Sequence, residues 1–233
     1  MPNPHLEPYI KLVEFLGLAL GPDYEVALHD LTDKNHSIIA IANSHVSGRE
    51  IGAPLTNVAL KTLMDKSYLT QDYRLHYRSV STNGKTLRSS TYFIKEKNDA
   101  IIGMLCVNFD DSRYQALSNE ILRLCHPDAF VEKHYQFDES LVINSHTDIP
   151  TAEYFHSSIN VVAGDAVSRE LARLGLTADR LTAEERIQII AALESGGIFL
   201  LKGAVKDVAD ALHCSQASVY RYLSQIKADE AEH

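Results

Sequence analysis

The strongest constraint on the fold lies near the C-terminus, where two short apolar-periodic segments are separated by three residues. Residues 205–212 carry apolar side chains at a spacing of three and four, which places them on one face of a helix. Ser215 follows the turn and is a good N-cap, because its hydroxyl can accept from the free N–H groups of a new helix. A second helix is therefore predicted from Gln216, with Val219 and Ile226 buried. Two helices joined by so short a turn predict a helix-turn-helix.

The second helix points short polar groups, an aromatic ring and an arginine outward. Side chains of these kinds meet base edges and phosphates when a helix lies in the major groove of DNA. A plain helical hairpin is the alternative, but it does not account for this exposed set. His213 stands where such turns usually carry glycine, and histidine tolerates the left-handed backbone better than most residues. The residues predicted to contact DNA are Lys202, Ser215, Gln216, Ala217, Ser218, Tyr220, Arg221 and Lys227.

The net charge of the chain is -9, which is unusual for a protein that binds nucleic acid. Within residues 200–228 the balance is different, because this segment contains four lysine or arginine residues and two aspartates, which gives a local charge of +2. This charge predicts weak non-specific binding. Specific contacts, doubled by dimerisation, would then supply most of the affinity.

The N-terminal half changes from helical to strand periodicity. A helix is predicted over residues 5–20, closed by Gly21-Pro22, and a second short helix over residues 54–65. Strands are predicted over residues 25–31, 37–42, 73–82, 85–95 and 100–109, and the last of these is apolar on both faces, as a central strand would be.

Asn83-Gly84 is typical of a two-residue turn between two strands. Such a turn would place Thr82 opposite Lys85. The same register would pair Val80 with Leu87, Ser79 with Arg88, Tyr77 with Ser90, and Leu75 with Tyr92.

These elements predict an α+β fold, with a PAS-like five-stranded antiparallel sheet and helices followed by an all-α helix-turn-helix domain. The predicted sensor domain spans residues 1–126, a polar linker spans 127–153, and the helix-turn-helix domain spans 181–233. Residues 154–180 carry an apolar stripe that fits a helix packed against a partner subunit or against either domain. A dimer contact is the preferred interpretation.

The segments EVALHDL, SIIAIANSHVSGREIGAPLT and GIFLLKGAVKDVADALHCSQASVYRYL resemble the YheO-like transcriptional regulators, a family that includes D-arginine utilisation repressors. The resemblance covers most of the chain. It implies a PAS-type sensing domain followed by a helix-turn-helix that binds operator DNA. It implies no particular ligand.

Two polar groups of side chains are candidates for a ligand site. In residues 43–49, Arg49 offers a planar fork for a carboxylate and Gly48 lets backbone N–H groups approach an anion; a surface turn with a structural arginine is the alternative. On the hairpin, hydroxyl and aromatic side chains share a face that would suit a pocket, although an ordinary sheet surface is the stronger interpretation. The predicted ligand residues are Asn43, Ser47, Gly48, Arg49, Tyr77, Ser79, Ser90 and Tyr92.

Signals of catalysis are missing from the sequence. Eleven histidines are scattered without metal-ligand spacing, and three cysteines form no Cys-x-x-Cys. Nucleophile elbows, phosphate loops and dinucleotide fingerprints are also missing. We therefore predict no enzyme activity, no catalytic residue, no metal and no cofactor. No apolar stretch is long enough to cross a membrane, and a cytoplasmic protein is expected.

Two hypotheses of different classes remain. In the first, the chain is a homodimeric repressor-type regulator whose partners are a double-stranded DNA operator and a small-molecule effector, possibly amino-acid-like. In the second, it is an adaptor whose helical module anchors a protein partner through Tyr220 and Arg221. The salt dependence of DNA binding distinguishes them.

Overall fold

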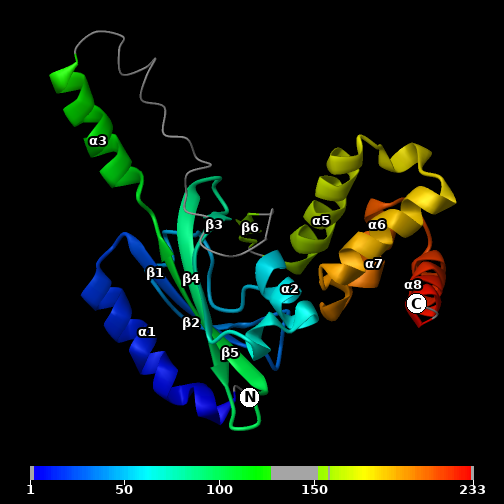
Figure 1. Ribbon diagram of the computed structural model, residues 1–233, viewed down its shortest axis with the longest axis horizontal. Coiled ribbons are helices and arrows are strands. Elements are labelled where there is room, and N and C mark those ends of the chain that lie inside the picture. Colours follow the sequence, from blue (N-terminus) through cyan, green and yellow to red (C-terminus); the bar gives the residue numbers. More distant parts are fainter. Residues whose placement is uncertain (1–2, 127–151, 157, 232–233) are drawn as a thin grey trace.

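The computed structural model describes residues 3–126, 152–156 and 158–231, and it consists of a sheet domain and a helical module that lie side by side (Figure 1). The sheet domain contains η1 (Pro4–Leu6), α1 (Glu7–Leu20), β1 (Tyr24–Asp30), β2 (Ile38–Ala42), α2 (Asn57–Asp65), η2 (Ser67–Leu69), β3 (Tyr73–Val80), β4 (Thr86–Lys95), β5 (Ile101–Phe109), α3 (Ser112–Cys125) and β6 (Glu153–Tyr154). The helical module contains α5 (Ile159–Leu174), η4 (Ala178–Arg180), α6 (Ala183–Ser195), η5 (Ile198–Leu200), α7 (Ala204–Ala211) and α8 (Gln216–Ala231).

The strand order of the sheet is β2-β1-β5-β4-β3-β6. The five predicted strands are present and pair antiparallel, and β5 lies between β1 and β4 as its apolar faces predicted. The sixth strand, β6, pairs parallel with β3 and was not predicted, because two residues are too few to show a period. It begins at the end of the predicted linker over 127–153; the rest of that linker, apart from Ala152, lies outside the described residues.

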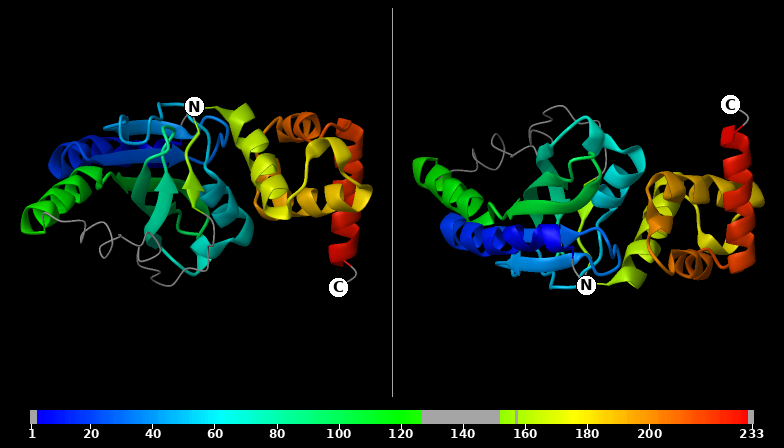
Figure 2. Two further views of the ribbon diagram at one scale, coloured as in Figure 1. Left: turned by 90° about the horizontal axis from the view of Figure 1, so that it is seen from above. Right: turned by 90° about the horizontal axis from the view of Figure 1, so that it is seen from below.

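The two faces of the sheet have different partners. Helix α1 covers the face that carries Val26, Leu28 and Leu105, and these side chains form one apolar cluster with Leu6 and Val13. The opposite face, which we call the inner face, is covered by α2 and by the chain around β6 (Figure 2). Polar and titratable side chains gather on the inner face, so it is the part of the sheet that can hold a site.

The register of the β3–β4 hairpin differs from the predicted one by one residue. Backbone N–H of Ser81 donates to the carbonyl of Lys85 at 2.9 Å, so the loop has three residues, with Gly84 at φ +83°. A glycine in the left-handed region closes a three-residue loop as readily as a two-residue one. Tyr77 consequently pairs with Ser89, and the predicted pairing of Tyr77 with Ser90 was wrong. A shift of one residue exchanges which side chains of β4 reach the inner face.

A second irregularity lies within β3. The register shifts between Arg74 and Tyr77, and His76 in the shifted stretch has a φ of 54°. The extra residue reverses the alternation of side chains, as a bulge does. Arg74 and Tyr77 therefore both point to the inner face, although their spacing of three would place them on opposite faces of a regular strand.

The helical module has one core, to which α5 contributes. Val162, Ala163, Ala166 and Val167 of α5 are buried with the apolar side chains of α6, α7 and α8. The apolar stripe that was interpreted as a dimer contact is thus covered by the chain itself. Thr182 and Glu185 form a capping box at the start of α6.

The sheet domain and the helical module are docked through polar and apolar contacts. The side chain of Asn35 accepts from the backbone N–H of Lys202 at 2.9 Å and donates to the Lys202 carbonyl at 2.9 Å. Gly197 lies against α2, where an added Cβ would be 2.8 Å from the Leu60 carbonyl oxygen. One apolar cluster runs from Met104 of the sheet through Leu60 of α2 into the helical module. The two parts therefore share a core through α2.

Candidate functional site

The turn between α7 and α8 has the geometry of a helix-turn-helix. His213 adopts φ 50°, which is the left-handed conformation that the sequence required at that position. Its Nδ1 lies 2.7 Å from a carboxylate oxygen of Asp179. Ser215 caps α8, because its hydroxyl oxygen accepts from the backbone N–H of Ser218 at 3.1 Å. Val219 and Leu212 are fully buried and fix the angle at which α8 leaves the turn.

The outer face of α8 carries the predicted DNA-contacting residues. Gln216, Ala217, Tyr220 and Arg221 are exposed, and so are Lys202, Ser215 and Lys227. The guanidinium of Arg221 lies over the ring of Tyr222 at 5.1 Å, which supports it near the helix surface. Ser218 differs from the others: it is half-buried and its hydroxyl lies 3.0 Å from that of Ser215. Its role in the structure is to complete the cap.

A groove of about 580 Å³ runs between α8 and the start of α7. Three of the predicted residues, Gln216, Tyr220 and Lys227, line it together with Gly203 and Lys206. The N-terminus of α7 has no side-chain cap, and the backbone N–H groups of Ala204 and Lys206 donate to the carbonyls of Leu201 and Gly203. Arg221 and Ala217 lie outside this groove, and Lys227 also approaches Glu194 at 3.5 Å. The sequence did not single out Lys206, although its place in the first turn of a helix is a signal for phosphate contact.

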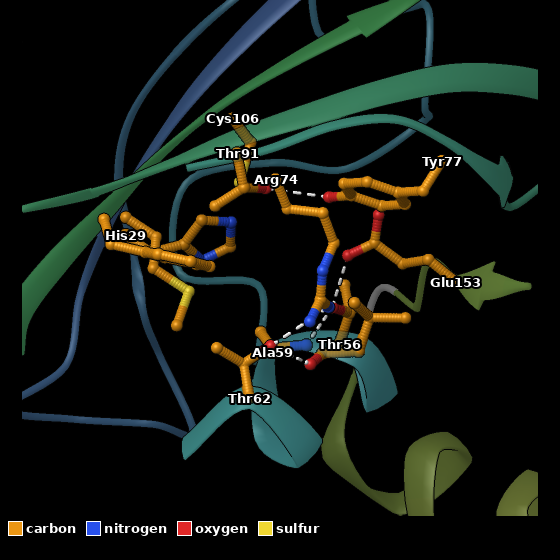
Figure 3. Close-up of a pocket in the computed structure, with 12 residues that line it drawn as sticks. His29, Thr56, Ala59, Thr62, Arg74, Tyr77, Thr91, Cys106 and Glu153 are labelled. Carbon is orange, nitrogen blue, oxygen red and sulfur yellow. Dashed lines mark hydrogen bonds between the residues drawn. The ribbon is translucent and has the colours of Figure 1, made fainter. Parts of the chain in front are cut away.

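A second candidate site is a cavity of about 10 Å³ between the inner face of the sheet, α2 and β6 (Figure 3). Its volume is close to the smallest that holds a water molecule, about 10–15 Å³. The lining residues come from six elements and from the residue before α2, and they are His29, Thr56, Val58, Ala59, Thr62, Arg74, Tyr77, Thr91, Phe93, Met104, Cys106 and Glu153.

Arg74 and Glu153 both line this cavity, and each has an atom that makes no hydrogen bond among the described residues. A terminal nitrogen of Arg74 donates to the Thr62 hydroxyl at 3.2 Å, and Thr56 donates to Glu153 Oε1 at 2.5 Å. Arg74 Nε and Glu153 Oε2 are buried and have no hydrogen-bond partner within the described part of the chain. Burial raises the pKa of Glu153, and the positive charge of Arg49 opposes that rise. The cavity is thus lined by one side chain with an unused donor, Arg74, and one with an unused acceptor, Glu153 (Figure 3).

The remaining titratable groups of the cavity are held neutral. Burial, with a smaller contribution from the charge of Arg49, lowers the pKa of His29 to about 3. Nδ1 of its ring lies 2.9 Å from the Ser37 hydroxyl. Burial raises the pKa of Cys106 to about 12 and that of Tyr77 well above its usual value. Tyr77 shares a hydrogen bond of 2.8 Å with Thr91.

Arg49 lies beside this cavity but does not present its guanidinium to it. Its exposed fraction is 1%, it donates to Glu25 Oε1 at 2.7 Å, and its guanidinium lies 3.8 Å from the ring centroid of Phe155. Burial alone would lower the pKa of Arg49, but the carboxylates of Glu25 and Glu153 outweigh burial and raise it. Ser47 donates from its hydroxyl to the same Glu25 carboxylate. The fork predicted to hold a ligand carboxylate is therefore engaged by a carboxylate of the chain itself.

Asn43 and Gly48, the other predicted residues of this segment, also make contacts within the fold. The Asn43 side-chain amide reaches the carbonyls of Gly17, Gly21 and Tyr24 at 2.8–3.1 Å. Gly48 packs closely against the side chain of Thr82. The geometry favours the structural alternative for residues 43–49, which join α1, β1 and the hairpin loop.

The hairpin residues divide between the two faces. Tyr77 lines the cavity, and Ser79 is buried next to it with its hydroxyl bonded to Ser89. Ser90 and Tyr92 were predicted on the same face and lie on the other one, where Tyr92 is 46% exposed. The one-residue shift of the hairpin explains the correction. Ser89 and Thr91 occupy the inner positions that Ser90 and Tyr92 were expected to fill.

Of the residues that line the cavity, the sequence reasoning predicted Tyr77 and missed the others. Arg74 reaches the inner face through a bulge, and Glu153 lies in a stretch that resembles a polar linker. Thr56 and Thr62 are spaced as an N-cap and an inward helix position before and within α2, which is a signal that was available.

The described residues contain no candidate metal site and no candidate membrane-spanning helix. Among the described residues, no group of three His, Cys, Asp or Glu side chains lies close enough together to hold a metal ion. In the same part of the chain, no helix combines the length and the apolar character needed to cross a bilayer.

Comparisons with known proteins agree with the two-part structure. A model of the YheO-like PAS domain matches residues 2–126. The chain belongs to this family. A model of an HTH domain matches residues 164–224, which includes most of α5 and the turn before α8.

Three relatives align with 97% of the chain. An uncharacterized protein of Haemophilus influenzae is 27% identical over 227 residues, or 92% of its own length. The protein YheO of Escherichia coli is 27% identical over 226 residues, or 86% of its length. The transcriptional regulator DauR of Pseudomonas aeruginosa is 23% identical over 225 residues, or 96% of its length. The YheO-like chain and these relatives thus match over both parts.

We predict that Arg49→Ala destabilises the YheO-like fold. The substitution leaves Glu25 charged and buried without its partner, which costs about 3–5 kcal/mol in other proteins. Urea unfolding of the purified chain would measure the loss. Glu25→Gln/Arg49→Met, which removes both charges, should cost less than Arg49→Ala alone. An Arg49→Ala protein of wild-type stability would refute the structural role and return Arg49 to the ligand candidates.

We also predict that stability depends on pH through His29. Its folded pKa of about 3 lies below the usual value of 6.5, so the unfolded chain binds a proton that the folded chain does not. Stability should therefore fall as pH decreases from 6.5 toward 3, by up to about 1.4 kcal/mol per pH unit for this one group. His29→Gln should remove that part of the slope in urea unfolding, whereas His5→Gln, at an exposed site, should keep it. Equal slopes in wild type and His29→Gln would contradict the assignment.

Proposed function

We propose that this YheO-like protein is a transcriptional regulator that binds operator DNA through α8 and senses a small molecule in the cavity of its PAS-like domain. The observation that carries the first part is the exposed face of α8, where a capped helix presents Gln216, Ala217, Tyr220 and Arg221 beyond a helix-turn-helix turn. A relative matched over both parts, DauR, is a transcriptional regulator by name.

DNA contact would combine α8 with the start of α7. The face of α8 would enter the major groove and read base edges, as the second helix of this motif does. A phosphate of the flanking backbone would then meet the side chains of Lys206 and Gln216, which line the groove at the start of α7. Lys202 lies in the turn before α7 and would extend the same contact. This arrangement uses most of the local positive charge.

Control of DNA binding would pass through α2. One side of this helix lines the cavity with Ala59 and Thr62, while Leu60 and Leu63 join the core of the helical module. A second route is the chain itself, since Glu153 of β6 lies in the cavity and the chain continues into α5. A molecule that shifts α2 or β6 would move the elements that contact η5 and lead into α5. The equilibrium between two docked positions of the helical module would then change.

The ligand would carry both a hydrogen-bond acceptor and a hydrogen-bond donor. Arg74 Nε needs an acceptor and Glu153 Oε2 needs a donor, so a molecule with an acidic or carbonyl end and an amine or hydroxyl end matches them. An amino-acid-like effector fits this description. The volume of about 10 Å³ means that such a molecule must displace part of the wall on entry, which links binding to movement of α2.

We predict that Arg221→Ala weakens specific operator binding by about 1–3 kcal/mol if the guanidinium reads a base, and weakens all sequences alike if it contacts a phosphate. Sites recovered by selecting genomic DNA with the purified protein would supply the operators for titration. Lys97→Ala, in the exposed loop between β4 and β5, is the control for loss of a positive charge. Unchanged operator binding by Arg221→Ala would remove this residue from the DNA interface.

The adaptor hypothesis gives a different result in the same assay. Affinity for duplex DNA that depends on phosphate contacts falls steeply with salt, whereas a protein interface responds weakly. The absence of any DNA selected above background, together with salt-insensitive binding of a protein, would favour the adaptor.

We predict that Arg74→Met keeps operator binding and loses the ligand. Thermal-shift screening of wild type against a panel of amino acids and small hydroxy acids should find stabilising compounds, and these should bind Arg74→Met about 10- to 100-fold more weakly. Arg88→Met is the matched control, because Arg88 lies on the exposed face of the neighbouring strand. Equal responses of the wild type and the Arg74→Met variant would exclude the cavity as the sensor site.

A further inference from the structure

Helix α3 lacks the packing that normally holds a short helix in place. None of its side chains is buried, and it projects from the end of the sheet domain away from the helical module (Figures 1 and 2). Among the described residues, the first turn of α3 contacts the body, where Arg113 pairs with Asp23 at 3.0 Å and Tyr114 meets Phe109 with ring centroids 5.5 Å apart. Isolated helices shorter than about 12–15 residues are marginal in water. Its 14 residues need a further surface to pack on.

The exposed apolar side chains of α3 follow the spacing of a coiled coil. Tyr114, Leu117, Ile121 and Leu124 are separated by three, four and three residues, and their exposed fractions are 57%, 61%, 53% and 78%. This is an a/d repeat, in which a narrow apolar seam faces a second helix with the same repeat. A helix lying on a globular core usually has a broader apolar stripe. We name these four residues the α3 seam.

The charges beside the α3 seam are compatible with a second copy. Arg113, Glu120 and Arg123 give α3 a mixed polar surface, although the whole chain carries -9. Two copies meeting here would avoid the repulsion expected of the acidic body as a whole. Helix α1 also carries exposed apolar side chains, since Phe15 and Leu18 are 64% and 79% exposed. A larger apolar area favours a stable dimer over a transient contact.

We propose that the chain forms a homodimer in which the α3 seam packs against the α3 seam of a second copy. The proposal does not use the stripe of α5, which is covered within the chain. It stands on the geometry of α3 and is independent of what α8 binds.

Sedimentation velocity of the full chain under reducing conditions tests this interface. Reducing conditions keep the exposed Cys125 from forming an adventitious link. The wild type should be a dimer, and Leu117→Glu/Ile121→Glu should raise the dimer dissociation constant by about 100-fold or more, because four carboxylates enter the seam. Both sites are exposed, so the fold should survive, as unfolding of the variant in urea would verify. Asn119→Glu, which adds a charge on the opposite face of α3, should leave the dimer intact.

The possible results divide clearly. A wild type that stays monomeric at all concentrations overturns the proposal, and the seam would then contact a different partner. A dimer that survives Leu117→Glu/Ile121→Glu overturns it as well, because another surface would hold the copies together. Equal weakening by Asn119→Glu would also overturn it, since the effect would then come from added charge rather than from the seam.

Discussion

The buried pair of Glu25 and Arg49 is the interaction on which the arrangement of the sensor domain depends. Removing both charges from water is costly, and the attraction between them offsets that cost only when the remaining hydrogen bonds are made. Here Glu25 accepts from Arg49, Asn108 and Ser47, so each oxygen has a donor. Arg49 also lies over Phe155, which follows β6 directly. The pair therefore connects β1 to the short strand that carries Glu153 and leads into the helical module.

Helix α2 makes the cavity and the helical module parts of one packed structure. Thr56 begins the helix by accepting from the N–H of Ala59, and the same hydroxyl donates to Glu153 in the cavity. On its other side the Leu60 carbonyl is against Gly197, where no larger residue fits without movement. A helix packed on both sides does not bend freely, because protein interiors are close-packed. Under the proposed sensing function, a change in the cavity would therefore displace the whole helix.

Much of the fold followed from periodicity, because helices, strands and the helix-turn-helix are repeated local patterns. The predicted central strand and the left-handed His213 both depend on a few neighbouring residues, and the structure has each of them. The misses required non-local information. Asn83-Gly84 fits two loop lengths, and the choice between them decides which hydroxyls face inward. The carboxylate partner of Arg49 lies 24 residues away, and a bulge brings Arg74 to the cavity.

The low positive charge around α8 and the distance between α8 and α3 both affect how a dimer of this chain would bind DNA. A net local charge of +2 gives little non-specific attraction to phosphates, so under the proposed function the affinity for DNA would come from specific contacts made twice. Helices α3 and α8 lie at opposite ends of the molecule in every view (Figures 1 and 2). If copies pair through α3, the spacing between the two reading helices depends on how each helical module is docked on its own sheet domain. A small rotation at α2 and Asn35 is then enlarged along the length of the molecule, and half-site recognition is sensitive to that spacing. In this arrangement, a ligand would change the orientation of the helical module on its own sheet domain, which is set through α2. The strength of the dimer contact would stay the same.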